Sequence, residues 1–155
     1  MSIAPIVRTV QVKASPARAF ELFATRMADW WPKGRTVGKN PHVAIVAEPR
    51  AGGRWFERDA EGQETPWGQV LAWEPPSRLL LAWRIGADWQ YDPDLLTEVE
   101  VVFAPEGEGA TRVSLEHRLL ENMGAAGEVA RASFDSDGGW GGLLQMFAAE
   151  AEKAS

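Results

Sequence analysis

Thr97-Glu-Val-Glu-Val-Val-Phe103 and Thr111-Arg-Val-Ser-Leu-Glu-His117 are two stretches in which apolar and polar residues alternate. The turn-forming residues 105–109 (Pro-Glu-Gly-Glu-Gly) lie between them, which predicts an antiparallel hairpin with strands near 95–103 and 111–117. Successive side chains of a strand point to opposite faces, so one set should face the core: Thr97, Val99, Val101, Phe103, Val113, Leu115 and His117. The pattern therefore predicts that the His117 ring points inward.

Five more strands are expected before this hairpin, because short runs rich in β-branched and aromatic residues alternate with clusters of Gly, Pro and other turn formers. The predicted strands span residues 6–13, 42–48, 53–58, 65–73 and 79–85. Such short connections favour antiparallel neighbours.

Helices are predicted at two places in the chain. Ser15 as N-cap and Pro16 at the first helical position begin two short helices that end near Trp30-Trp31. A long C-terminal helix should begin near residues 135–139, where Asp and Ser supply N-cap candidates, and should carry one apolar stripe: Trp140, Leu143, Leu144, Phe147 and Ala151. The sequence thus predicts a single α+β domain over 1–155, with a curved antiparallel sheet of about seven strands around this helix. It leaves the conformation of residues 119–136 open.

Composition excludes several classes of protein. The 155 residues include no cysteine and only two histidines, His42 and His117, so no disulfide, thiol nucleophile or metal site is predicted, and nothing indicates a cofactor. The net charge of −6 argues against a nucleic-acid partner. The N-terminus does not resemble a signal peptide, and the longest apolar run, residues 79–83, is far too short to cross a membrane. A cytoplasmic protein is therefore expected; nothing in the sequence indicates its oligomeric state.

Charge is distributed unevenly along the chain. Residues 1–60 hold ten basic and five acidic side chains, whereas residues 61–155 hold six basic and 17 acidic ones. Two interpretations are open. Either a basic face steers an acidic partner, or strands from the two halves interleave and their electrostatic fields cancel.

Several short motifs, in this order, resemble the START-like (SRPBCC, helix-grip) superfamily, and within it the branch named after the C-terminal domain of the activator of heat-shock chaperone ATPase. They are residues 14–20 (Ala-Ser-Pro-Ala-Arg-Ala-Phe), 30–32 (Trp-Trp-Pro), 49–55 (Pro-Arg-Ala-Gly-Gly-Arg-Trp), 68–79 (Gly-Gln-Val-Leu-Ala-Trp-Glu-Pro-Pro-Ser-Arg-Leu), 109–117 (Gly-Ala-Thr-Arg-Val-Ser-Leu-Glu-His) and 139–140 (Gly-Trp). The resemblance implies a helix-grip fold with a cavity between the sheet and the long helix. In this superfamily such a cavity commonly holds a hydrophobic or amphipathic small molecule.

The eight tryptophans of the chain allow two interpretations within that fold. They could line the implied cavity and offer indole N–H groups to a ligand, or simply fill the interior. The candidate ligand-binding residues are Trp55, Trp67, Trp83, His117, Trp140 and Phe147.

Two other functions remain open. The first is a protein-partner module of the chaperone ATPase activator type, for which the exposed-loop aromatics Trp89 and Tyr91 are candidate contacts or a cavity lid. The second is a polyketide-cyclase-like enzyme using His117 as acid or base. No second catalytic group is identifiable, so binding is favoured over catalysis and a structural role for His117 over a chemical one.

The strand at 53–58 presents a further choice, because either Arg54 with Arg58 or Trp55 with Glu57 must turn inward. An inward arginine would imply an acidic ligand group. Outward arginines are the ordinary expectation.

Overall fold

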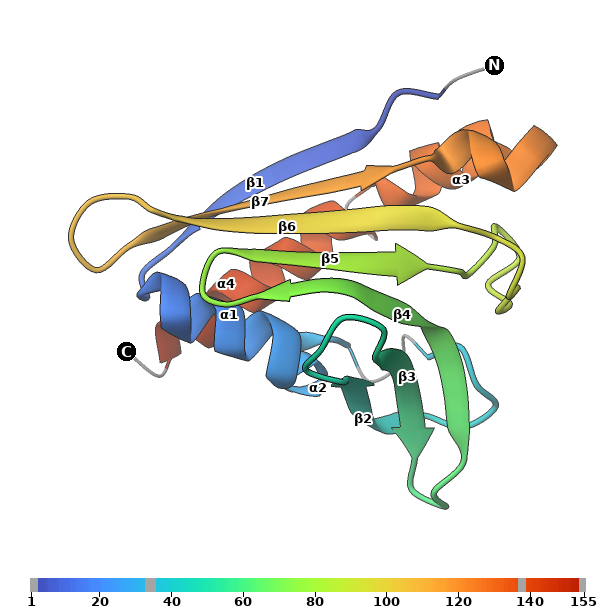
Figure 1. Cartoon of the computed structure of the whole chain (residues 1–155), viewed down its shortest axis with the longest axis horizontal. Coiled ribbons are helices and arrows are strands. Elements are labelled where there is room, and N and C mark those ends of the chain that lie inside the picture. The colour runs from blue at the N-terminus through green and yellow to red at the C-terminus, as the bar shows by residue number, and fades with distance from the viewer. Residues whose placement is uncertain (1–2, 33–35, 137–138, 154–155) are drawn as a thin grey trace.

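The structure is a computed structural model of the chain that describes residues 3–32, 36–136 and 139–153. Seven antiparallel strands form one curved sheet in the order β1-β7-β6-β5-β4-β3-β2 (Figure 1). In chain order they are β1 (Ile6–Val12), β2 (His42–Ala47), β3 (Arg54–Asp59), β4 (Glu64–Glu74), β5 (Arg78–Trp83), β6 (Thr97–Pro105) and β7 (Thr111–Arg118). All seven predicted strands are confirmed, with ends within two residues of those expected.

The helices lie on one side of this sheet, and Figure 1 shows the last of them running behind the strands. They are α1 (Pro16–Thr25), α2 (Met27–Trp30), the 3-10 helix η1 (Leu120–Ala126), α3 (Gly127–Phe134) and α4 (Trp140–Lys153). The predicted cap of α1 is confirmed, because the Ser15 hydroxyl accepts the Arg18 backbone N–H at 3.2 Å. Within the described residues, none of these helices has the length and apolar character needed to cross a bilayer.

The core lies between the sheet and α4, as the alternation and the helical stripe predict. All seven residues assigned to the inner face of the β6–β7 hairpin are buried, His117 among them. The five stripe residues of α4 are buried too. These patterns confirm the α+β helix-grip architecture.

Strand β4 bends sharply between its pairing with β3 and its pairing with β5 (Figure 1). Gly68 lies in this bend, opposite Trp55 on one side and Trp83 on the other. A Cβ atom on Gly68 would lie 1.7 Å from the carbonyl oxygen of Ala82. Glycine at this position therefore permits the close approach of β4 and β5 that curls the sheet.

Replacing Gly68 by alanine should lower the free energy of unfolding by about 3 kcal/mol, the upper part of the usual cost of overpacking, because two backbone segments must separate. Urea denaturation measures the change. Gly107→Asn is a suitable control, since asparagine tolerates the positive φ of 75° there and nothing lies within 4 Å of its Cβ position. A Gly68→Ala variant as stable as the wild type would show that the bend does not need glycine.

The last helix begins at Trp140, next to the stretch 135–139 predicted for its start, but the capping role predicted for Asp135 is wrong. Asp135 caps the C-terminus of α3 instead of the N-terminus of α4, and its carboxylate accepts a hydrogen bond from Arg8 Nε at 2.8 Å. This pairing with β1 holds the α3 end against the sheet. Asp137 and Gly138, which belonged to the predicted capping stretch, lie outside the described residues.

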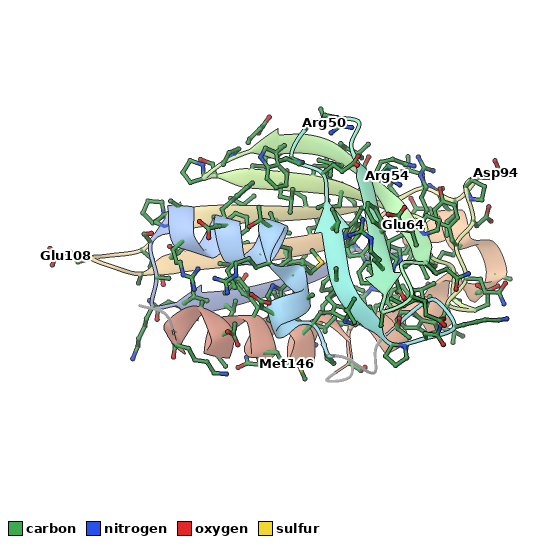
Figure 2. All side chains as sticks on the ribbon, turned by 90° about the horizontal axis from the view of Figure 1, so that it is seen from below. Arg50, Arg54, Glu64, Asp94, Glu108 and Met146 are labelled. Atoms are coloured by element: carbon green, nitrogen blue, oxygen red, sulfur yellow. The ribbon has the colours of Figure 1, made fainter. Side chains whose placement is uncertain are left out.

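In the sheet, strands of the basic half lie on both sides of a continuous block of strands from the acidic half, since β1 pairs with β7 and β3 with β4. Ion pairs join the halves, including Arg8 with Asp135, and Arg54 and Arg58 with Glu64. Figure 2 shows Arg54 and Glu64 close together on the β3–β4 side of the molecule. The ordinary expectation for β3 is thus confirmed, because both arginines face outward while Trp55 and Glu57 are buried.

Candidate functional site: an aromatic pocket at the start of the last helix

A pocket of about 430 Å³ lies where the inner face of β4 and β5 meets the start of α4. Its other walls come from the end of α2, the segment before β2, the loop after β5 and the end of α3. The lining residues are Trp31, Thr36, Val37, Trp67, Trp83, Ile85, Trp89, Ser133, Phe134, Ser136, Gly139, Trp140 and Leu143. Among these described residues none has a titratable side chain, so the pocket presents aromatic rings, aliphatic groups and hydroxyls.

Three tryptophans, Trp67, Trp83 and Trp140, belong to the buried part of the lining, together with Trp31, Ile85, Phe134 and Leu143. Each of these three donates its indole N–H within the protein: Trp67 to Glu57 Oε1 at 2.8 Å, Trp83 to the Ile85 carbonyl at 2.9 Å, and Trp140 to His117 Nδ1 at 3.0 Å. The expectation that these N–H groups are offered to a ligand is therefore wrong for these three. What they present to the pocket is ring surface.

The outer part of the pocket combines an aromatic and a polar side. The Trp89 ring, 43% exposed, lies with its centroid 5.5 Å from that of Phe134 and 6.5 Å from that of Trp83. Exposed Ser133 and Ser136 border the same opening. Trp89 thus folds back over the pocket from its loop, whereas Tyr91 pairs with Ile85 and does not line it.

His117 is fully buried behind the pocket. The Thr97 hydroxyl donates to the Trp83 carbonyl at 2.8 Å, so its oxygen must accept the N–H of His117 Nε2, 2.9 Å away. The bare Nδ1 then accepts from Trp140. Burial lowers the pKa of His117 from 6.5 to about 3, so the ring is neutral at pH 7. Both nitrogens are occupied, and the ring holds Trp140 in place instead of facing the pocket.

The six residues predicted to bind a ligand divide into two groups. Trp67, Trp83 and Trp140 line the pocket; Trp55, His117 and Phe147 are buried behind its walls. Trp55 packs against the Trp67 and Trp83 rings at centroid distances of 5.2 and 5.7 Å. The tryptophans therefore do both things that the sequence allowed: some line the pocket and others fill the interior.

Other lining residues were not predicted. Phe134 comes from the stretch 119–136. Its buried residues Gly127, Ala130 and Phe134 recur at helical spacing, and this spacing in the sequence could have identified α3. For Trp31 the sequence predicted only that the two short helices end near it. Glu57 does not line the pocket, but its carboxylate accepts hydrogen bonds from three residues that do. Its inward position follows from its alternation with Arg58 along β3.

The described residues contain no group of three or more His, Asp or Glu side chains that could bind a metal ion.

The family model described as "Activator of Hsp90 ATPase homolog 1-like protein" matches residues 13–152. No curated protein matches the chain significantly.

Solved structures resemble the chain over nearly its full length. Txn09, an anthrahydroquino-gamma-pyrone synthase, is 38% identical, with a TM-score of 0.66 and coverage of 96% of this chain and 97% of that one. CalC, a self-sacrificing resistance protein from Micromonospora echinospora, is 31% identical, with a TM-score of 0.73 and coverage of 97% and 95%. A protein from Rhodobacter sphaeroides is 21% identical, with a TM-score of 0.63 and coverage of 96% and 89%, and shares the fold.

Proposed function

The chain belongs to the Activator of Hsp90 ATPase homolog 1-like family of the START-like superfamily, and on this premise we propose that it binds a planar, aromatic, amphipathic small molecule in the tryptophan-lined pocket. The observation that carries the proposal is the ring surface of Trp67, Trp83 and Trp140 around a space of about 430 Å³. Small-molecule sites commonly have volumes of about 300–1,000 Å³ and mostly apolar walls.

The chemistry of the walls supports an aromatic ligand. Because the indole N–H groups of Trp67, Trp83 and Trp140 are already donated within the protein, these three side chains offer the ligand stacking and edge contacts in place of hydrogen bonds. A saturated chain could fill the space but would not gain the aromatic contacts.

The placement of the hydroxyls supports an amphipathic ligand in one orientation. Ser133 and Ser136 border the opening, and Thr36 lies on the same lining. A ligand should therefore enter with its aromatic end first and leave its polar substituents near the solvent. The name of Txn09, which is 38% identical, refers to an anthrahydroquinone, a fused-ring aromatic, and supports the same class of ligand.

Titration of the protein with anthraquinone-2-sulfonate should quench tryptophan fluorescence saturably and raise Tm, whereas palmitate should do neither at the same concentration. Trp89→Ala should weaken binding about fivefold, because one aromatic wall is lost. Val129→Ala is the matched control, since that side chain is 72% exposed on α3 and does not line the pocket. Palmitate binding equal to that of the anthraquinone would refute the aromatic class, and no response to either probe would refute the proposal.

The two other functions stay predictions. A reaction in this pocket would need a proton-transfer group other than His117, because that ring is enclosed and neutral. A protein partner would have to contact Trp89 or Tyr91 from outside, and salt-dependent co-purification of a stoichiometric partner would identify it.

A further inference from the structure

Glu57 is a buried acidic residue directly behind the pocket wall. Its side chain points inward from β3 and the residue is only 2% exposed. An acidic group in such a position is costly unless hydrogen bonds replace the water it has lost. The donors around it therefore indicate what the group does.

Four donors converge on the two carboxylate oxygens. Oε1 accepts the indole N–H of Trp67 at 2.8 Å and the backbone N–H of Val37 at 2.7 Å. Oε2 accepts the backbone N–H of Gly38 at 3.0 Å and the hydroxyl of Thr36. A carboxylate has about four acceptor positions, so these donors occupy all of them.

Three of the four donor residues line the pocket, namely Thr36, Val37 and Trp67, whereas Glu57 does not. The carboxylate thus joins the segment before β2 to an indole ring on β4. Gly38 completes the contact, because a Cβ there would lie 2.5 Å from Thr65 Oγ1 and 3.2 Å from Glu57 Oε2. The segment can approach the sheet this closely only with glycine at that position.

We propose that Glu57 is a positioning residue for the ligand site: it sets the shape of the wall formed by Thr36, Val37 and Trp67, and ligand affinity depends on it without contact to the ligand. This inference rests on the proposed function, since it concerns the same pocket. It assigns a binding role to a side chain that neither exposure nor pocket lining would select.

Glu57→Gln tests the proposal with almost no change in volume. The amide nitrogen is itself a donor, so it must face two of the four donors that the carboxylate accepts. We expect anthraquinone-2-sulfonate to bind about tenfold more weakly. The Trp67 indole proton resonance should move upfield, and the Val37 and Gly38 amides should exchange faster with solvent.

Asn40→Ala is the matched control. Asn40 joins the same segment to the sheet region through hydrogen bonds of 3.1 Å to Asp59 and to Glu61, but it does not line the pocket. Its variant should bind the probe within about twofold of the wild type, because neither of its two hydrogen bonds involves a residue that lines the pocket. A tenfold loss in this control as well would mean that general loosening of the segment, and not Glu57, sets affinity.

Hydrogen exchange of the wild-type protein provides a second measurement if Glu57→Gln does not fold. The Val37 and Gly38 amides should be protected as strongly as strand amides; exchange at the rate of an exposed loop would overturn the proposal. Probe binding by Glu57→Gln within twofold of the wild type would overturn it too. Failure of the wild type to bind any probe refutes the proposed function instead, while the exchange data still report whether the carboxylate holds the segment.

Discussion

Acidification from pH 6.5 to about pH 3 is expected to lower the free energy of unfolding by about 5 kcal/mol through His117 alone. That is comparable with the whole stability of many domains of this size. About 2 kcal/mol of this loss should appear between pH 7 and pH 5, before most of the carboxylates are protonated.

The sign follows from burial of the ring. In the folded protein the pKa of His117 is lowered by burial from 6.5 to about 3, and the side chains around it, Thr97, Trp83, Phe134 and Trp140, are not titratable. Between these two values the unfolded chain binds a proton that the folded protein excludes. The contribution of His117 to the free energy of unfolding is fully present above pH 6.5 and falls by about 1.4 kcal/mol for each pH unit below it.

Urea denaturation at pH 5, 6, 7 and 8 measures this slope. Carboxylates add little in that range: the hydrogen bond from Arg78 lowers the pKa of Glu100 below 4.5, so its contribution is lost only at lower pH. The wild type should lose about 2 kcal/mol between pH 7 and pH 5, and His117→Gln, although less stable throughout, should lose much less. Equal slopes for the two proteins would mean that His117 is not the group that titrates.

Phe147→Ala is expected to lower the free energy of unfolding by about 3–5 kcal/mol, the usual cost of removing a buried phenyl ring. The ring is fully buried on α4, with its centroid 5.2 Å from that of Phe23 and 5.5 Å from that of Trp30. It therefore joins α4 to both short helices, and its loss leaves a cavity that these helices cannot easily close.

Met146→Ala is the control for this substitution at the adjacent position. Met146 is 47% exposed on the outer side of α4 (Figure 2), so its truncation should change stability by about 0.5 kcal/mol or less. Because Phe147 lies outside the pocket lining, the folded Phe147→Ala variant should bind anthraquinone-2-sulfonate as the wild type does. A tenfold loss of affinity would show that the ring shapes the pocket after all.

Strand positions could be predicted because the signal for them is local. Alternation with a period of two residues decides which side chains of β6 and β7 are inward, and turn formers mark the ends of the strands. The short helices and the α4 stripe follow from equally local patterns. The role of Asp135 could not be predicted in this way, because its contact with Arg8 joins residues 127 positions apart.

The candidate site could be predicted only in part for the same reason. Alternation places Trp55, Trp67 and Trp83 on the inner face alike, but it does not show which of these rings reaches the pocket and which lies behind its wall. The bend of β4 at Gly68 and the packing of α3 and α4 decide that Trp67 and Trp83 reach the pocket and Trp55 does not.

By itself the sequence determined the seven strands, the inward His117 and the aromatic character of the interior, because hydrophobic periodicity and turn chemistry act over a few residues. The helix-grip family followed from the resemblance of its short motifs, in their order, to that family. Only the tertiary structure decided that a pocket remains among the rings, that His117 supports Trp140, and that Glu57 joins Thr36, Val37 and Trp67 into one wall. These features depend on where a buried polar group finds its hydrogen-bond donors. Such donors come from segments that are distant in the chain and meet only when it is folded.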